Sequence, residues 1–392
     1  DGEEIVLDQR QTLPIAADMV APNYCDMPID KYDDLGQVGV YGFMREGRRA
    51  SVMLAERGCR AKCSFCSVRI FNGPKVRRRE AVAVADEIEN LARAYDIRHI
   101  TWLDDDLLFN EERSIELFDE IASRKLDLTW DATNGLIAAA ITPRLLDSMV
   151  ASGCIGFNLG LESGSPEILR EIHKPGTVDA YFKCKDIVSR YPELFVKGFL
   201  IIGFPHETFR MILRTVNMAV DLGLDWYPMQ TLNPMPSTEI FKSMAEEGLI
   251  SAVHREGRGW KAAIFSSLNQ KTREDMEKAQ AVGYVDLFNA VPDLDAVPTK
   301  EELDDLWFVV DYRINYGVIF AMTDSSKLQK KRLVLRDIAD RITRDNPLAN
   351  YFLSIVESKL GDPDESQRRK ELMSEYLDRS AYWQTRFEAL GL

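Results

Sequence analysis

Apolar and polar positions repeat in a regular order between residues 50 and 235. Short apolar runs, typical of buried parallel strands, are each followed by a stretch with helical periodicity. The expected strands cover residues 51–55, 99–103, 128–131, 154–161, 195–202 and 226–232. The expected helices cover residues 80–95, 110–123, 143–153, a segment from 166, 177–190 and 208–222. Thr142 and Ser165 are expected to cap the starts of the helices from residues 143 and 166.

Six strand–helix units in series predict an α/β fold, a partial (β/α)6 barrel of the TIM type. Such barrels carry their chemistry at the carboxyl ends of the strands. The unusual polar and small residues fall at these ends. They are Asp104–Asp106, Asn134, Glu162 with Ser163, Gly203 to Glu207, and the run of residues 233–238.

The flanks differ from this core. Residues 1–48 are turn-rich and are expected to form an extended or linker segment, and residues 49–240 are expected to form the barrel. Residues 241–392 are expected to be a helical region without a catalytic motif. Residues 250–298 have no clear period, but Thr299 and Glu302 form a capping box that begins a helix through residue 319. Further helices fit residues 327–344, 348–360 and 365–390.

Composition narrows the class of protein. The chain has 392 residues, 45% of them hydrophobic, and no apolar run long enough to span a bilayer. It begins without a signal-peptide pattern, and its net charge is −14, so a cytoplasmic protein without a nucleic-acid partner is expected. The longest basic cluster, residues 75–79, could bind a phosphate or carboxylate of a small substrate, or could be a solvated or salt-bridged segment.

Three of the six cysteines are clustered. Cys59, Cys63 and Cys66 form a C-x3-C-x2-C triplet directly after the first expected strand. This spacing brings three thiolates to one side of a tight loop, where they can hold three irons of a cubane iron–sulfur cluster. The fourth iron then stays open for a ligand that is not protein, which is a catalytic feature.

Two other interpretations of the triplet are weaker. Structural zinc prefers four ligands, usually as two separated pairs, and the remaining residues Cys25, Cys154 and Cys184 form no second pair. A disulfide framework does not suit six cysteines in a long chain without a secretion signal.

The triplet with Phe65 before its last cysteine resembles the signature of the radical S-adenosylmethionine (radical SAM) superfamily. The resemblance implies a [4Fe-4S] cluster on Cys59, Cys63 and Cys66 whose open iron chelates SAM. An electron from the cluster then cleaves SAM to methionine and a 5′-deoxyadenosyl radical, which abstracts hydrogen from a substrate. The implied partners are a small-molecule or lipid-like substrate and an electron donor such as flavodoxin or ferredoxin.

Several residues are expected to bind SAM on this basis. Phe65 would pack beside the adenine, and Asp104 and Asp105 would face the ammonium or sulfonium group, although acids at a helix start can also be merely solvated. Glu162 and Ser163 would bond the ribose or the amino-acid end of SAM, although serines there can also cap the next helix. The set is completed by Asn134 and by Gly203, where the backbone would approach a ligand closely. No catalytic residue is assigned, because a lone exposed histidine such as His206 usually has no catalytic role.

The resemblance extends over roughly residues 15–240 and is closest to the cobalamin-associated radical SAM subgroup. The motifs are Arg57-Gly-Cys, residues 73–79, the Asp104 run, residues 160–163, residues 203–207 and residues 234–238, where Ser237 stands in place of the usual Gly. A cobalamin-binding domain commonly precedes these motifs, and this chain shows none, so weak or no cobalamin binding by the chain as given is expected. A methylthiotransferase would need three more clustered cysteines and a basic tail.

Two classes of function therefore remain. The first is a radical SAM enzyme that rearranges, cyclises or oxidises a small molecule, with cobalamin-dependent C-methylation as the alternative. The second is a non-catalytic iron–sulfur or zinc-binding protein that uses the barrel for recognition. The strand-end residues favour the enzyme, because a binder needs no SAM-shaped set of groups.

Overall fold

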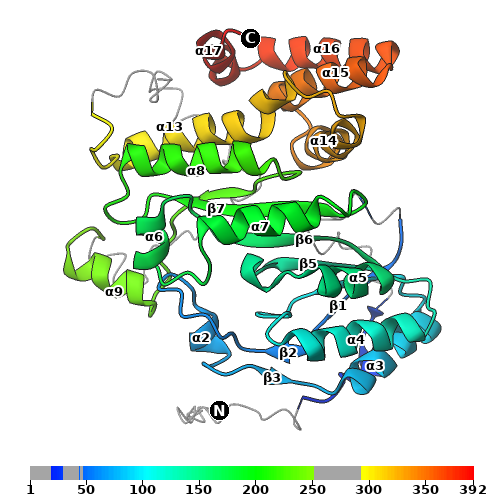
Figure 1. Ribbon diagram of the computed structural model, residues 1–392. Coiled ribbons are helices and arrows are strands. Elements are labelled where there is room, and N and C mark those ends of the chain that lie inside the picture. Colours follow the sequence, from blue (N-terminus) through cyan, green and yellow to red (C-terminus); the bar gives the residue numbers. More distant parts are fainter. Residues whose placement is uncertain (1–18, 30–43, 45–46, 251–292) are drawn as a thin grey trace, which may run out of the picture.

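A computed structural model describes residues 19–29, 44, 47–250 and 293–392. Its main sheet has six parallel strands in the order β1-β4-β5-β6-β7-β8, which confirms the predicted α/β half barrel (Figure 1). A separate antiparallel ribbon pairs β2 with β3. The strands are β1 Ala50–Met53, β2 Glu56–Arg57, β3 Arg77–Arg78, β4 His99–Trp102, β5 Thr129–Leu136, β6 Cys154–Glu162, β7 Phe195–Ile202 and β8 Met229–Thr231.

The helices follow the predicted periodicity with a few differences. They are α2 Val68–Phe71, α3 Ala81–Tyr95, α4 Glu111–Ser123, α5 Pro143–Ala151, α6 Pro166–Glu171, α7 Val178–Val188, α8 Phe209–Leu222, α9 Glu239–Glu246, α13 Lys300–Asp311, α14 Ser325–Asp337, α15 Pro347–Leu360, α16 Pro363–Asp378 and α17 Ala381–Leu390. The single helix expected over residues 365–390 is wrong, because Ser380 separates α16 from α17. None of the described helices has the length and apolar character needed to cross a membrane.

The outer face of the sheet is apolar and is covered by helices. Trp102 of β4 and Trp130 of β5 meet edge to face, and Phe118 of α4 stacks on Trp130 at 5.0 Å between ring centroids. Strand residues alternate between faces, so the apolar side chains of all the strands reach this layer. Helices α3, α4, α5, α7 and α8 supply its other half (Figure 1). This core holds the strand ends, and the loops that leave them, in fixed positions.

The inner face of the half barrel is polar. Thr101 is paired with Asp131 across β4 and β5, and Asn158 with Lys197 across β6 and β7. All four side chains are buried, together with His99, whose ring bonds a carboxylate oxygen of Asp131 at 2.9 Å. The barrel interior is therefore lined by hydrogen-bonding groups rather than by the branched apolar residues typical of a closed barrel core.

The C-terminal helices close the open edge of the barrel. The indole of Trp307 on α13 donates to the carbonyl of Met229 in β8 at 2.9 Å. Asn315, in a π-helical turn (η5, Tyr312–Tyr316), donates to and accepts from the backbone of Tyr227. Phe195 and Trp226 share a hydrophobic core with α13 to α17. The helical region is thus packed on the sheet, and it gives the edge strand β8 the partners that a lone edge would lack.

The domain limits expected at residues 48 and 240 remain a prediction. Much of the first segment and all of residues 251–292 lie outside the described residues. The caps do match expectation: Thr142 accepts from the Leu145 amide, and Thr299 and Glu302 form the predicted capping box. The third strand was expected to end at residue 131, but β5 continues to Leu136 with an irregular register, so Asn134 lies within it.

The turn before β6 generates a stability prediction. Gly153 has φ +99°, and a Cβ there would lie 2.3 Å from the Leu128 carbonyl oxygen, whereas Gly361 has φ +85° with nothing within 4 Å. Gly153→Ala is expected to lower the free energy of unfolding by roughly 2–4 kcal/mol, from the left-handed backbone plus the clash. Gly361→Ala should cost only about 1 kcal/mol. Urea unfolding would measure both, and equal losses would contradict the prediction.

Candidate functional site

The three clustered cysteines lie together on one loop at the carboxyl end of β1. This segment, residues 58–66, is called the cysteine loop below, and it runs from β2 to the short helix α2. Its three thiols are free and partly exposed. The Cys66 amide donates to the Cys63 carbonyl at 3.1 Å, and the Ala61 amide donates to the Cys59 sulfur at 3.4 Å. The loop is therefore a tight turn around its own thiols.

The other cysteines are placed elsewhere. Cys25 is exposed in a short 3-10 turn (η2, Tyr24–Asp26), Cys154 is buried at the start of β6, and Cys184 is buried on α7. Cys154 is thus at the opposite end of its strand from the candidate site. Three of the cysteines are therefore on the cysteine loop and the other three lie outside it, and metal binding by the loop thiols stays a prediction.

Burial and mutual proximity keep the thiols protonated in the absence of a cation. Burial raises the pKa of Cys59 to about 11 and that of Cys63 to about 12, and it raises the pKa of Cys66 as well. The charges of neighbouring cysteines raise the pKa of Cys59 and Cys63 further. The carboxylates of Glu162 and Asp105 do the same for Cys66. A bound cationic metal group reverses this balance, because coordination favours the thiolate.

Three consecutive aspartates hold the backbone that leads into the cysteine loop. The Asp104 carboxylate accepts from the amides of Ala55, at 3.0 Å, and Glu56, at 2.6 Å. Asp105 accepts from the Gly58 amide at 2.8 Å, and Asp106 accepts from the Arg60 amide at 3.2 Å. Successive side chains thus hold successive stretches of residues 55–60. Charge-assisted bonds of this kind are about twice as strong as neutral ones.

This arrangement changes the interpretation of Asp104 and Asp105. Both were expected to face the ammonium or sulfonium group of SAM. In the structure Asp104 is buried and its carboxylate accepts from the amides of Ala55 and Glu56, just before the cysteine loop, while Asp105 accepts from Gly58 and from the side chain of Asn72 at 2.8 Å. The acids lie at the strand end as expected, but the contacts they make are with the cysteine loop and the segments beside it.

Two further contacts fix the middle of the loop. The Ser64 amide donates to the carbonyl of Ile172, just after α6, and the Ser64 carbonyl accepts from the Ile240 amide of α9, both at 3.0 Å. Phe65, expected beside adenine, meets Phe204 edge to face at 6.0 Å between centroids. The loop therefore contacts the segments that follow β6, β7 and β8.

Gly58 allows the loop to approach the chain before β3. It has φ +90°, and a Cβ on it would lie 2.2 Å from the Lys75 carbonyl oxygen. No L-residue side chain fits this position without moving the Lys75 backbone. This is the physical reason for the glycine that precedes Cys59.

A buried ion pair lies beside the thiols. Glu162 ends β6 and Lys174 follows α6, and their side chains meet at 2.7 Å with little exposure. The Lys174 ammonium is close enough to Cys63 and Cys66 to oppose the rise in pKa of both thiols. Sequence reasoning missed Lys174, because a lysine twelve residues beyond Glu162 carries no local motif. Gly160 makes room for the pair, since a Cβ there would meet the Lys174 nitrogen at 2.7 Å.

Glu162 has a strained backbone. Its φ of +66° lies in the left-handed region that non-glycine residues rarely occupy. Strain of this kind costs on the order of 1–3 kcal/mol and persists where the surroundings enforce it, often at functional sites. Here the conformation turns the carboxylate toward Lys174 and the cysteine loop.

The Ser163 side chain makes its hydrogen bonds with other residues of the fold. Its side chain is fully buried, its hydroxyl lies 3.2 Å from that of Thr215 on α8, and it accepts from the Ser165 amide at 3.1 Å. Ser165 caps α6 as predicted, by accepting from the Ile168 amide. The serines of this motif join β6, α6 and α8, which leaves Glu162 as its ligand-facing candidate.

The loop after β7 is held by one buried acid. Glu207 accepts from the amides of Gly203, at 2.6 Å, and Phe204, at 3.2 Å, and its other oxygen has no hydrogen-bond partner in the described part of the chain. Burial raises its pKa to about 8. Gly203 has φ +83° and backs onto Leu303 of α13. His206 is 67% exposed and lies 3.2 Å from the Glu247 carboxylate, so its position supports no assignment as an acid or base.

Asn134 and Ser237 complete the set of expected residues. The side-chain amide of Asn134 donates to the Leu103 carbonyl at 2.7 Å. This bond supports the segment that carries the aspartates. Ser237, which stands where Gly is usual, has φ +71°. A glycine preference at this position therefore follows from the backbone of the turn rather than from contact with a ligand.

The donor set suits a cluster better than a single ion. Within the described ranges, no three His, Cys, Asp or Glu side chains are arranged to hold a metal ion. The thiols are nevertheless close enough to influence one another's pKa, come from one loop, and are placed beside a lysine. Cysteine thiolates are the usual ligands of iron–sulfur clusters, so the loop has the donor chemistry for such a cluster. A cavity of about 400 Å³ is lined by residues of α6 and of the segment after it, among them Arg170, His173, Lys174 and Thr177.

Comparison with known proteins finds similarity over part of the chain. Residues 55–219 match the model described as the radical SAM superfamily. The chain is 28% identical over 229 residues to an uncharacterized methyltransferase of Pyrococcus horikoshii, covering 58% of this chain and 47% of the relative. It is 27% identical over 213 residues to cytidylyl-2-hydroxyethylphosphonate methyltransferase of Streptomyces wedmorensis, covering 52% and 39%. The chain thus spans about half the length of the curated relatives it matches, or less.

One solved structure is similar over most of the chain at low identity. The radical S-adenosylmethionine methyltransferase TsrM from Kitasatospora setae aligns with a TM-score of 0.48 and 15% identity, covering 85% of this chain and 62% of that one.

Glu207 generates a pH prediction. The pKa of its carboxyl is about 8 in the folded chain against an ordinary 4.5, so between these values the folded protein keeps a proton that the unfolded chain has lost. Stability should therefore fall as the pH rises through this range, by up to about 1.4 kcal/mol per pH unit from this group. Glu207→Gln should remove that slope in urea titrations at several pH values, whereas Glu116→Gln on the exposed side of α4 should not. Parallel pH profiles for wild type and Glu207→Gln would contradict the burial argument.

Glu162 and Ser163 generate a binding prediction. Glu162→Ala is expected to weaken SAM binding by roughly 1–3 kcal/mol without loss of iron, because the residue faces the site from outside the cysteine loop. Ser163→Ala is expected instead to lower the melting temperature, since its hydroxyl bonds only within the fold. Calorimetric SAM titration and iron analysis of the reconstituted protein would separate the two, with Glu116→Ala as the control. Unchanged SAM affinity in Glu162→Ala would leave the acid as a structural partner of Lys174 alone.

Proposed function

We propose that this chain, whose residues 55–219 match the radical SAM superfamily, is the core of an enzyme that binds a [4Fe-4S] cluster on Cys59, Cys63 and Cys66 and acts on a small molecule. One observation carries the proposal: the three thiols share a loop that the strand-end acids Asp104 to Asp106 hold at its backbone. A loop fixed in this way is preorganised for its metal group.

The residues around the loop have the chemistry that such a group requires. Bound there, the cluster supplies the electron for reductive cleavage of SAM. The Lys174 ammonium can donate to a carboxylate, and the Glu162 carboxylate can accept from an ammonium or from ribose hydroxyls. Their bond to each other at 2.7 Å keeps both buried charges paired. Phe65, which packs edge to face on the buried Phe204, offers an aromatic surface to a purine.

Methyl transfer to a small molecule is the reaction class that the relatives favour. Both curated relatives described above are named methyltransferases, which moves the balance from rearrangement, cyclisation or oxidation toward the methylation alternative. Methyl donation leaves S-adenosylhomocysteine, whereas reductive cleavage leaves methionine and 5′-deoxyadenosine. The two products therefore distinguish the reaction classes even when the substrate is unknown.

Anaerobic reconstitution tests the proposal. The chain with iron, sulfide, SAM and dithionite is expected to form 5′-deoxyadenosine. Cys59→Ala, Cys63→Ala or Cys66→Ala should abolish both the cluster absorbance and the product, and Cys25→Ala, outside the loop, should change neither. Product from a variant lacking all three loop cysteines would contradict the cluster assignment.

The same assay with and without hydroxocobalamin addresses the methyl alternative. S-adenosylhomocysteine that forms only with the corrinoid would favour a methyltransferase. Tight, stoichiometric corrinoid binding by this chain would overturn the expectation of weak binding.

A further inference from the structure

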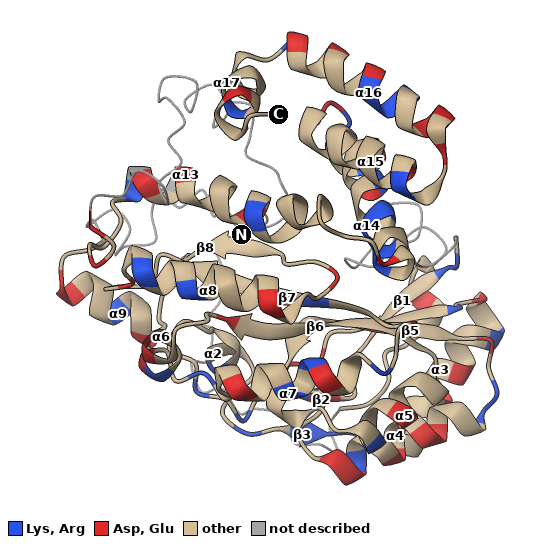
Figure 2. Ribbon diagram, turned by 45° about the horizontal axis from the view of Figure 1, so that its top comes forward, with Lys and Arg blue, Asp and Glu red and all other residues tan. Residues whose placement is uncertain are grey.

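A basic surface surrounds the cysteine loop of this acidic chain. Residues 57–79 contain eight Lys or Arg residues and no Asp or Glu, although the whole chain has a net charge of −14. Figure 2 shows these basic residues along the ribbon of β2 and β3 and the loops beside α2. The positive charge is therefore concentrated where the thiols are.

Part of this charge is neutralised within the fold. Arg60 pairs with Asp106, Arg78 with Glu56, and Arg79 with Glu87. The side chain of Arg69 donates to backbone carbonyls of the cysteine loop.

The remaining cations are exposed and point outward. Arg57, Lys62 and Lys75 have no ion-pair contact with an acidic side chain anywhere in the part of the chain that the structure describes. These three residues, with Arg77, Ile70 and Phe71, are called the basic patch below.

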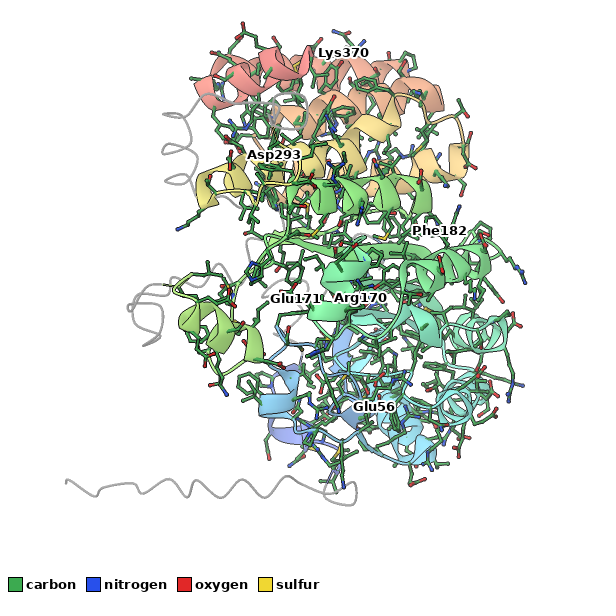
Figure 3. All side chains as sticks on the ribbon, turned by 60° about the vertical axis from the view of Figure 1, so that its left-hand side comes forward. Glu56, Arg170, Glu171, Phe182, Asp293 and Lys370 are labelled. Atoms are coloured by element: carbon green, nitrogen blue, oxygen red, sulfur yellow. The ribbon has the colours of Figure 1, made fainter. Side chains whose placement is uncertain are left out.

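The β2–β3 ribbon explains why the patch is one surface. Glu56 is opposite Arg78 in the ribbon, and both are largely buried as an ion pair (Figure 3 labels Glu56). The next pair, Arg57 opposite Arg77, brings two cations together. Like charges directly opposite each other destabilise a ribbon, and an anionic partner on that face removes the penalty.

Exposed apolar side chains lie within this basic surface. Phe71 is 70% exposed and Ile70 42% exposed, both on α2. Phe71 is five residues beyond Cys66 in sequence, so the two α-carbons are no more than about 18 Å apart. The Gly58 position is in contact with the Lys75 carbonyl, which brings Arg57 and Lys75 to the same side of the loop. Apolar residues rimmed by charge are typical of protein interaction sites.

We propose that the basic patch docks an acidic one-electron carrier protein beside the cysteine loop. The inference rests on the proposed function, because the reaction needs one electron from outside the chain. The reduced carrier loses one electron, the metal group on the loop gains it, and no covalent bond forms or breaks between the two proteins. Redox partners form small, weak interfaces, and opposite charges raise their rate of encounter.

Other anionic partners fit the surface less well. A nucleic acid is met by an extended basic surface, and this patch is confined to one loop and ribbon of a chain with net charge −14. Exposed Phe71 and Ile70 have no role in binding a small phosphate or carboxylate. An acidic protein uses both the charge and the apolar centre.

The test compares two reductants on the full, reconstituted chain. A reduced bacterial flavodoxin serves as the probe, and dithionite, which needs no docking, serves as the second electron source. The double variant Arg57→Glu with Lys75→Glu reverses the patch, and the first change places a carboxylate opposite Arg77, so ribbon pairing is not weakened. Lys370→Glu on α16, at the far end of the molecule from Glu56 in Figure 3, is the matched control.

The expected result is a selective loss. Flavodoxin-supported formation of 5′-deoxyadenosine should fall by roughly tenfold or more in the double variant, through a higher KM for flavodoxin, with the dithionite rate unchanged. Flavodoxin binding to the wild-type chain, measured by titration calorimetry, should weaken with ionic strength and be lost in the double variant, and Lys370→Glu should behave as wild type. Lys75→Glu alone, which lies outside the cysteine loop, should give a smaller loss of the same selective kind if the double variant folds poorly.

Two outcomes separate the inference from its premise. Equal flavodoxin binding and equal flavodoxin-supported rates in wild type and the patch variants would overturn the docking surface, as would a short RNA that binds the patch more tightly than flavodoxin. Absence of product from wild type with dithionite would refute the proposed function instead, and the calorimetric comparison would still decide whether the patch binds the carrier.

Discussion

The contact between three consecutive carboxylates and the backbone of residues 55–60 is the constraint on which the candidate site depends. Asp104, Asp105 and Asp106 follow the end of β4. Their carboxylates accept hydrogen bonds from amides of the segment that follows β1. Since β1 and β4 are adjacent parallel strands, both segments emerge at the same edge of the sheet. A loop that would otherwise be free to move is thereby attached to the most rigid part of the molecule.

The same contact explains how so much charge is accommodated near the thiols. Asp104 is fully buried and burial raises its pKa to about 7, but its bonds to amide groups and the nearby Arg78 oppose that rise. Arg60 pairs with Asp106, and Lys174 with Glu162. Every buried acid of this group faces a donor that belongs to the loop or supports it, as buried charges require. Arg57, Lys62 and Lys75, which pair with no acid among the described residues, are exposed to solvent.

The polar interior of the half barrel has a second consequence. The buried carboxylate of Asp131 is bonded to His99 through one oxygen, and its other oxygen has no partner among the described residues. The buried amine of Lys197 has its pKa lowered to about 7 by burial. Such an interior does not stabilise the fold by apolar contact, so stability comes from the outer layer of helices and from α13 to α17 on the β7–β8 edge. This division leaves the strand ends available for chemistry.

The sequence alone determined what is local or periodic. Apolar runs with helical spacing predicted the half barrel, Thr142, Ser165 and Thr299 marked helix starts, and the spacing of Cys59, Cys63 and Cys66 marked the thiol loop. Contacts between distant segments have no such local sign. Only the tertiary structure placed Lys174 against Glu162, assigned Asp104 and Asp105 to amides some fifty residues earlier in the chain, and buried Ser163 against Thr215. The physical reason is that strand ends adjacent in a parallel sheet are separated by a whole helix in sequence, so the partners of a strand-end side chain are decided by sheet order and not by neighbouring residues.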